Sequence, residues 1–236
     1  MTENKYSKIL VLGAGPVVIG SSSEYDYSAV SVCRALKEEG ISVVSVNSNP
    51  DTIMTDKNVA DTVYIEPLNG ETVKKIIEKE IPDAIIGTTG GEAGLEICLE
   101  LLQNGYLDEH GTKLLGIKPE TIKAIRNEQA LRDTLENVGE PYVSAKVLPT
   151  DAECVTFAGE IGFPVLISPA FTPDFSEPIR CENADDILSG FGSCAERSLV
   201  NEVYVRKCVD DYKEVEFVAM RDSFGNCISV SSTENI

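Results

Sequence analysis

The first half of the sequence alternates short apolar runs with helical patterns, and this alternation constrains the fold more than any other feature. The apolar runs lie at residues 8–12, 41–46, 62–65, 83–86 and 114–116. Helical patterns lie between them at residues 27–39, 71–80 and 92–103, and Gly40 ends the first of these. Strands that alternate with helices through short connections form parallel sheets with helices on both faces. We therefore predict an α/β fold whose first half is Rossmann-like.

The second half has a different order of elements and predicts an α+β domain. Helical patterns occur in two stretches of residues 119–138 and again at 152–161 and 184–188. Strand patterns occur at residues 143–148, 164–167, 202–207, 214–220 and 227–231. We predict a Rossmann-like domain at residues 1–122 and a second domain at residues 123–236. No helical pattern follows the last strand, so we expect a sheet with an uncovered edge.

Charge and cysteine content exclude several classes of function. The 39 acidic residues outnumber the 20 basic ones, giving a net charge of −19, and we therefore expect neither nucleic acid nor an anionic membrane as a partner. The chain has no bilayer-spanning apolar run and no signal-peptide pattern at its start, which predicts a cytoplasmic protein. The seven cysteines lack metal-site spacing, and His110 is the single histidine, so zinc and Ser–His–Asp chemistry are disfavoured. We expect the cysteines to be buried or half-buried free thiols.

Three loops follow strands of the first half, at the sheet edge where ligands usually bind. They read GAGPVVIG at residues 13–20, NSNPDTIMTD at residues 47–56 and TTGGE at residues 88–92. A dinucleotide fingerprint has a third glycine or alanine where this chain has Val18, and an acid where the second strand ends at Asn47. An NAD site is therefore disfavoured, whereas a structural turn and a small-ligand site both remain open.

Seven sequence strings, in register along the chain, carry a specific resemblance. They read EYDYS, NSNPDTIMTD, YIEPL, KIIEKEIPDAI, TTGGE, IGFPVLISPAFT and YKEVEFVAMRDSFGNCISVSSTENI. Together they resemble the amino-terminal module of the large subunit of carbamoyl phosphate synthetase. The resemblance implies a Rossmann-like pre-ATP-grasp domain followed by a partial α+β ATP-grasp domain. In that family the first module activates bicarbonate with ATP and forms carbamate with ammonia, and the metal-binding Glu and Asn residues lie beyond the matching segments.

Several positions that the resemblance makes functional depart from the family pattern. Two nucleotide-clamping arginines correspond to Glu128 and Ser168, and the adenine-hinge acid corresponds to Lys207. The glycine-rich phosphate loop is replaced by Asp174, Phe175, Ser176, Glu177 and Pro178. Bidentate arginine–phosphate contacts cannot be supplied by serine or glutamate, and proline has no amide hydrogen to donate. These substitutions predict weakened binding of ATP.

Two positions remain compatible with a nucleotide site. The resemblance places Val209 in the adenine wall and Glu214 at the ribose. The alternating pattern also puts Glu214 and Glu216 on one face of a strand, where both side chains could simply be solvated. We assign no catalytic residue and no metal ligand in this chain.

Three functions remain as hypotheses. The substitutions favour a non-catalytic binding or accessory module, which needs no cofactor alone and has a synthetase or glutaminase subunit as its partner. The second hypothesis is a split subunit of an ATP-dependent ligase, which uses ATP and Mg²⁺ once a partner completes it. The third is a small-ligand binder at the carboxyl edge of the Rossmann-like sheet.

Overall fold

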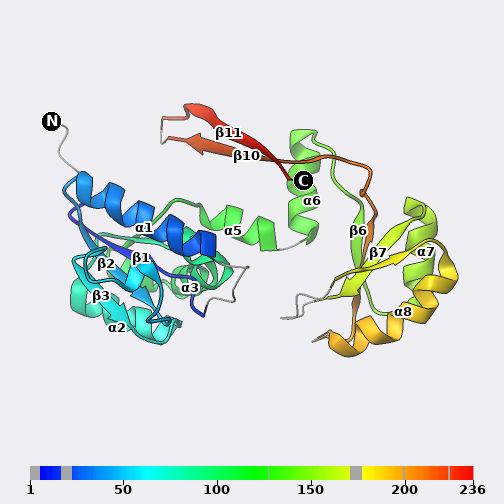
Figure 1. Ribbon diagram of the computed structural model, residues 1–236, viewed down its shortest axis with the longest axis horizontal. Coiled ribbons are helices and arrows are strands. Elements are labelled where there is room, and N and C mark those ends of the chain that lie inside the picture. The colour runs from blue at the N-terminus through cyan, green and yellow to red at the C-terminus, as the bar shows by residue number, and fades with distance from the viewer. Residues whose placement is uncertain are drawn as a thin grey trace. The chain divides into compact units, whose positions relative to one another are not determined.

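The computed structural model describes residues 6–16, 23–126, 128–170, 177–198, 200–222 and 224–235 (Figure 1). The chain divides into two compact units, Met1–Thr134 and Leu135–Ile236. The division falls inside helix α6 (Glu128–Val138). The predicted domain boundary at residues 122 and 123 stays a prediction.

The first unit contains a five-stranded parallel sheet, which confirms the fold predicted from the alternating pattern. The strand order is β3-β2-β1-β4-β5, and each neighbouring pair is parallel. The strands are β1 (Lys8–Leu12), β2 (Ser42–Asn47), β3 (Thr62–Ile65), β4 (Ala84–Ile86) and β5 (Lys113–Leu115). Chain order reverses between β2 and β4 on either side of β1, which makes the carboxyl end of β1 the switch point of the sheet.

Helices cover both faces of this sheet because alternate residues of each buried strand point to opposite sides. Ile9 and Val11 pack against Ala29 and Cys33 of helix α1. On the other face, Leu10 packs against apolar residues of helices α2 and α3. Figure 1 shows α1 on one side of the sheet and α2 and α3 on the other. The helical elements of this unit are α1 (Ser23–Glu38), η1 (Ile53–Thr55), α2 (Gly70–Glu80), η2 (Thr88–Gly90), α3 (Gly91–Gln103), α4 (Tyr106–Glu109) and α5 (Pro119–Arg126).

The second unit contains a four-stranded antiparallel sheet in the order β6-β9-β7-β8. Its strands are β6 (Ala145–Leu148), β7 (Val165–Pro169), β8 (Ile179–Cys181) and β9 (Val203–Lys207). Helices α7 (Asp151–Ile161) and α8 (Ala184–Arg197) cover one face (Figure 1), where they bury Val165, Ile167, Val203 and Val205. This arrangement is the α+β domain that the sequence predicts.

Helix α8 is longer than the helix predicted at residues 184–188. It begins at a capping box, in which the Asn183 side chain accepts from Asp186 N and the Asp186 side chain accepts from Asn183 N. It then continues through Gly190 to Arg197. A Cβ at Gly190 would lie 3.1 Å from Ile167 Cδ1, so glycine lets the helix approach the sheet closely. Tertiary packing therefore outweighs the low helix propensity of glycine.

Strands β10 (Glu214–Arg221) and β11 (Cys227–Asn235) form a separate antiparallel hairpin. Among the described residues they pair with no other strand, and every residue of both is exposed. This agrees with the uncovered edge expected from the sequence. Six cysteines are buried, but Cys227 lies exposed on this hairpin, so the expectation that all seven are at least half-buried is wrong there. No helix in the described part of the chain is long and apolar enough to cross a membrane.

Candidate functional site

The face of the four-stranded sheet opposite α7 and α8 carries a cross-strand row of four side chains. Arg206 of β9 pairs with Ala145 of β6 and with Leu166 of β7, and Leu166 pairs in turn with Arg180 of β8. Directly paired residues project from the same face of a sheet. Two arginines therefore flank a leucine on the side that the helices leave uncovered.

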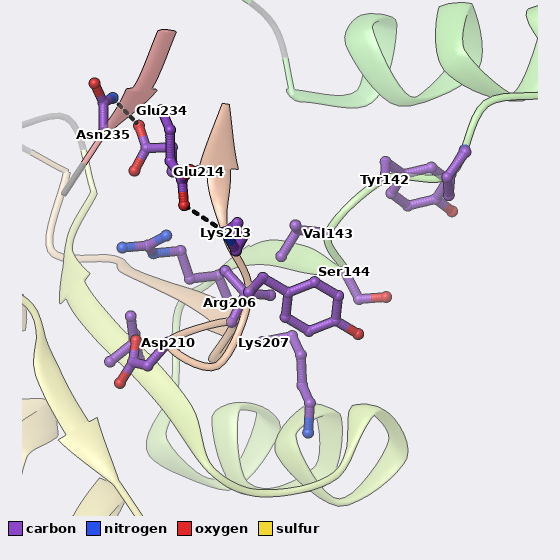
Figure 2. A pocket seen from close by; sticks show the side chains of 14 residues that line it. Tyr142, Val143, Ser144, Arg206, Lys207, Asp210, Lys213, Glu214, Glu234 and Asn235 are labelled. Atoms are coloured by element: carbon purple, nitrogen blue, oxygen red, sulfur yellow. Dashed lines mark hydrogen bonds and ion pairs between the residues drawn. The ribbon is translucent and has the colours of Figure 1, made fainter. Parts of the chain in front are cut away.

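A pocket of about 1120 Å³ lies at this face, between the sheet and the base of the hairpin (Figure 2). It brings together the two site residues predicted from the sequence, Val209 and Glu214. Whether these two bind nucleotide stays a prediction. The described residues that line it are Pro141, Tyr142, Val143, Ser144, Leu166, Arg206, Lys207, Val209, Asp210, Tyr212, Lys213, Glu214, Glu234 and Asn235.

Glu214 is held at the base of the hairpin by the opposite strand. Asn235 Nδ2 donates to Glu214 Oε1 at 3.0 Å and to Glu216 Oε1 at 3.3 Å. The two glutamates therefore share a strand face, as the alternating pattern predicts. Beside them, Lys213 Nζ forms an ion pair with Glu234 Oε1 at 2.9 Å. Glu214 also lines the pocket, where its carboxylate oxygens are hydrogen-bond acceptors.

The side chain of Lys207 lies on the helix-covered side of the sheet. Its Nζ donates to the carbonyl oxygens of Gly162, at 2.8 Å, and Phe163, at 3.3 Å, which follow α7. Figure 2 shows the lysine extending toward the helix and away from Arg206. Lys207 is among the residues that line the pocket, but its ammonium group is bonded to these backbone carbonyls.

Arg180 connects β8 to the segment that follows β9. Its Nε donates to Glu182 Oε1 at 2.8 Å, and its Nη1 contacts Cys208 Sγ at 3.2 Å and forms an ion pair with Asp210. The hydrogen bond from the Cys208 thiol and the charges of Arg180 and Arg206 lower the pKa of the Asp210 carboxyl. Asp210 is therefore an ionised, paired group at the rim of the pocket.

The phosphate-binding positions inferred from the resemblance are only partly described. Ser168 is half-buried on β7 and pairs with Tyr204, on the same face as Leu166, but it does not line the pocket. Glu177 and Pro178 are exposed just before β8. The side chain of Glu128 lies outside the described residues, as do Asp174, Phe175 and Ser176.

The loops at the carboxyl edge of the first sheet are bonded to one another. Asn47 Oδ1 accepts from Gly15 N at 2.8 Å, and Asn47 Nδ2 donates to Thr52 Oγ1 at 3.1 Å. Thr89 Oγ1 donates to Leu12 O at 2.8 Å. The described part of the GAGPVVIG string, up to residue 16, is thus bonded to the NSNPDTIMTD loop through Asn47. Val18 lies outside the described residues.

Sequence reasoning missed one contact that explains why two of the strings occur together. The Asp26 carboxylate in EYDYS accepts from Ile53 N at 2.7 Å and from Met54 N at 2.9 Å, in NSNPDTIMTD. No local pattern reveals this pairing, because 27 residues separate Asp26 from Ile53. Its effect is to fix η1 against the start of α1. The described residues contain no group of three or more His, Cys, Asp or Glu side chains placed to bind a metal ion.

Solved structures with similar folds define the class. The biotin carboxylase domain of *Hydrogenobacter thermophilus* 2-oxoglutarate carboxylase, crystallised with MgADP, ADP and bicarbonate, matches with a TM-score of 0.74 and 21% identity. The match covers 97% of this chain and 50% of that one. *Campylobacter jejuni* biotin carboxylase, in its complex with β,γ-ATP, matches with a TM-score of 0.73 and 20% identity, over 98% and 51% of the two chains. The fold is that of an ATP-grasp protein with its pre-ATP-grasp domain.

Sequence comparison identifies the family within this class. Residues 5–124 match the carbamoyl phosphate synthase preATP-grasp domain, and residues 127–236 match the carbamoyl-phosphate synthase L chain ATP binding domain. The chain belongs to the carbamoyl phosphate synthase large-chain family, which confirms the resemblance. It is 46% identical over 233 residues to the carbamoyl phosphate synthase large chain of *Agathobacter rectalis*, covering 99% of this chain and 22% of the relative.

A shorter relative is also similar. The "carbamoyl phosphate synthase large chain, N-terminal section" of *Methanopyrus kandleri* is 41% identical over 230 residues, which cover 98% of this chain and 41% of that protein. The chain thus spans about a fifth of the full-length large chains and less than half of this section.

Proposed function

We propose that this chain supplies the pre-ATP-grasp domain and the first part of the ATP-grasp domain to a carbamoyl phosphate synthase large-chain assembly. The observation that carries the proposal is the match to one family along nearly the whole chain, at 46% identity to a large chain. Because the chain spans 22% of that relative, formation of carbamoyl phosphate would need the remaining segments of a large chain. These segments, or a glutaminase subunit, are the proposed partners, and the proposed location is the cytoplasm.

The pocket beside β9 is the proposed nucleotide site. It places the apolar side chains of Leu166 and Val209 in the same cavity as the Glu214 carboxylate. This combination suits a nucleotide, whose flat base needs apolar contacts and whose ribose hydroxyls donate to a carboxylate. In the assembled protein ATP and Mg²⁺ would bind here, with the metal ligands supplied by the partner segments.

A second function, that of a non-catalytic accessory module, is favoured by one observation in the described region. Ser168 stands where the resemblance places a phosphate-clamping arginine, and a hydroxyl cannot replace a guanidinium fork. A chain of this kind could assemble with its partner and position it without turning over nucleotide. The two functions share the assembly step and differ in the chemistry that follows.

The experiment combines the purified chain with the separately produced remainder of the *A. rectalis* large chain, the part beyond the matched region. Release of inorganic phosphate is measured with and without bicarbonate. ATP is the nucleotide supplied. Bicarbonate-dependent hydrolysis that requires both polypeptides is the expected result. The remainder alone, at the same concentration, is the control.

The outcomes separate the two functions. Complex formation in sedimentation velocity without any hydrolysis would favour the accessory module, and Ser168→Arg would then be expected to raise nucleotide affinity. Absence of a complex at micromolar concentrations would overturn both, because each requires the partner.

A further inference from the structure

We propose that Arg180 is a positioning residue for the pocket beside β9, and that it fixes the segment at residues 208–213, which contributes Val209 to the pocket, against strand β8. The inference deepens the proposed function, because it rests on the pocket being the ATP site. It is carried by the contacts of one guanidinium with the two residues on either side of Val209.

The segment between β9 and β10 needs side-chain contacts to hold its position. The structure describes residues 208–213 in full, and they form neither helix nor strand. Cys208 N donates to Pro164 O at 3.2 Å, and Tyr212 N donates to Val209 O at 2.9 Å, but the segment has no strand ladder. Backbone without a ladder opens more readily than a strand does. The residues of this segment that line the pocket are Val209, Asp210, Tyr212 and Lys213.

Arg180 supplies such contacts from β8. It projects from the same face of the sheet as Leu166, its cross-strand partner, which lines the pocket. Its Nη1 donates to Cys208 Sγ at 3.2 Å and forms an ion pair with Asp210. The Cys208 thiol donates in turn to the Asp210 carboxylate. The three side chains are therefore bonded to one another, and two of them flank Val209 in the sequence.

The guanidinium of Arg180 is itself held in one orientation. Its Nε donates to Glu182 Oε1 at 2.8 Å, so the planar group has partners on two sides. The Arg180 and Asp210 side chains are 44% and 53% exposed, and an ion pair of this exposure contributes little by itself. Here one group bonds three partners at once, and bonds that share a group strengthen one another. We therefore expect a local effect on the segment at residues 208–213 and a small effect on the fold as a whole.

The test is isothermal titration calorimetry of the full chain with ATP and Mg²⁺. Arg180→Met keeps the apolar stem and removes the donors, so it should weaken ATP binding by about fivefold, the factor expected for one exposed ion pair. Asp210→Ala should weaken binding by a similar factor, although it removes a negative charge from the rim of a pocket for an anion. Arg180→Lys still pairs with Asp210 and should bind ATP within about twofold of the unaltered chain, a rescue that a general loss of structure would not show.

Hydrogen–deuterium exchange measures the positioning without any nucleotide. In Arg180→Met the amides of residues 208–213 should exchange about fivefold faster, while those of β6 and β7 keep their rates. The matched control is Arg34→Met, the same substitution at an exposed arginine of α1 that lies outside the pocket. It should change neither the affinity for ATP nor the exchange of residues 208–213.

Tighter binding of ATP by Asp210→Ala would show that charge at the rim, and not the position of the segment, sets the affinity, and would overturn the inference. Unchanged affinity or unchanged exchange in Arg180→Met would overturn it as well, and so would the lack of ATP binding by the unaltered chain at millimolar concentration. Assembly with the large-chain remainder is measured separately by sedimentation, so these results would leave the assembly proposal standing.

Discussion

At the scale of single residues, much of this structure depends on carboxylates that accept hydrogen bonds from backbone amides of distant segments. Asp26 fixes η1 in this way, and Asp61 accepts from Val43 N at 2.8 Å. Asp83 Oδ2 accepts from Ser7 N at 2.6 Å and from Lys8 N at 2.9 Å, and so connects the entry of β4 to the entry of β1. These bonds lower the pKa of the Asp83 carboxyl. The Asp83 carboxylate therefore stabilises the fold more when it is ionised than when it is protonated.

This gives a pH-dependent prediction for Asp83→Asn. The substitution removes the charge, so the free energy of unfolding at pH 7 should fall by roughly 0.5–1 kcal/mol, since the site is exposed and screened by solvent. Because the folded-state pKa is lowered, the stabilisation is present above the ordinary carboxyl pKa of about 3.9 and is lost as the pH falls through the folded value. The difference in stability between the two proteins should therefore begin to shrink as the pH falls below about 4.

Urea unfolding at a series of pH values measures this difference. Asp108→Asn is the control, because Asp108 is exposed and its side chain accepts no backbone hydrogen bond among the described residues. A gap between Asp83→Asn and the unaltered chain that stayed constant down to pH 3 would show that the charge of Asp83 is not its cause.

At the scale of elements, glycine sets how closely the loops at the switch point approach one another. A Cβ on Gly90, at the end of η2, would lie 2.5 Å from the carbonyl oxygen of Gly13, which follows β1. The atoms nearest to this Cβ all belong to the backbone, so no flexible side chain can move aside to make room for it. The TTGGE and GAGPVVIG strings therefore depend on each other through direct backbone contact.

Gly90→Ala is accordingly expected to destabilise the first unit by about 1–3 kcal/mol, the usual cost of overpacking. Gly159→Ala in α7 is the opposing control, since a Cβ there meets nothing within 4 Å and alanine is the better helix former. It should be neutral or stabilising by up to about 1 kcal/mol. Urea denaturation followed by circular dichroism compares the two, and equal stability of Gly90→Ala and the unaltered chain would contradict the packing argument.

The elements also show what could and could not be predicted from sequence. The β-branched run at 41–46 predicts β2 because a doubly buried strand needs apolar side chains on both faces. Helix α8 was predicted too short, because the contact of Gly190 with Ile167 is long-range. For the candidate site, the resemblance predicts Val209 and Glu214, and both residues line the same pocket. The alternation along β9 is local, but the bonds from Lys207 to the carbonyl oxygens of Gly162 and Phe163 span more than 40 residues, and no local pattern reveals them.

At the scale of the whole molecule, the hairpin β10–β11 stands out because every residue of both strands is exposed. Its register places Val218, Met220 and Ile228 on one face and Val215 and Phe217 on the other. Phe217 is 69% exposed and Val218 is 56% exposed. A two-stranded hairpin with apolar side chains on both faces is marginally stable in water without further packing. We therefore expect the exposed apolar side chains on both faces to pack against the remaining segments of a large chain.

Hydrogen–deuterium exchange of this hairpin, measured before and after addition of the *A. rectalis* large-chain remainder, tests the central claim most directly. In the chain alone, the amides of β10 and β11 should exchange rapidly, because little packing opposes local opening. In the assembly, the same amides should exchange at least about tenfold more slowly, while β1 and β2, already buried, change little. Unchanged exchange in the hairpin at saturating concentrations of the remainder would contradict the claim that this chain completes a large-chain ATP-grasp domain.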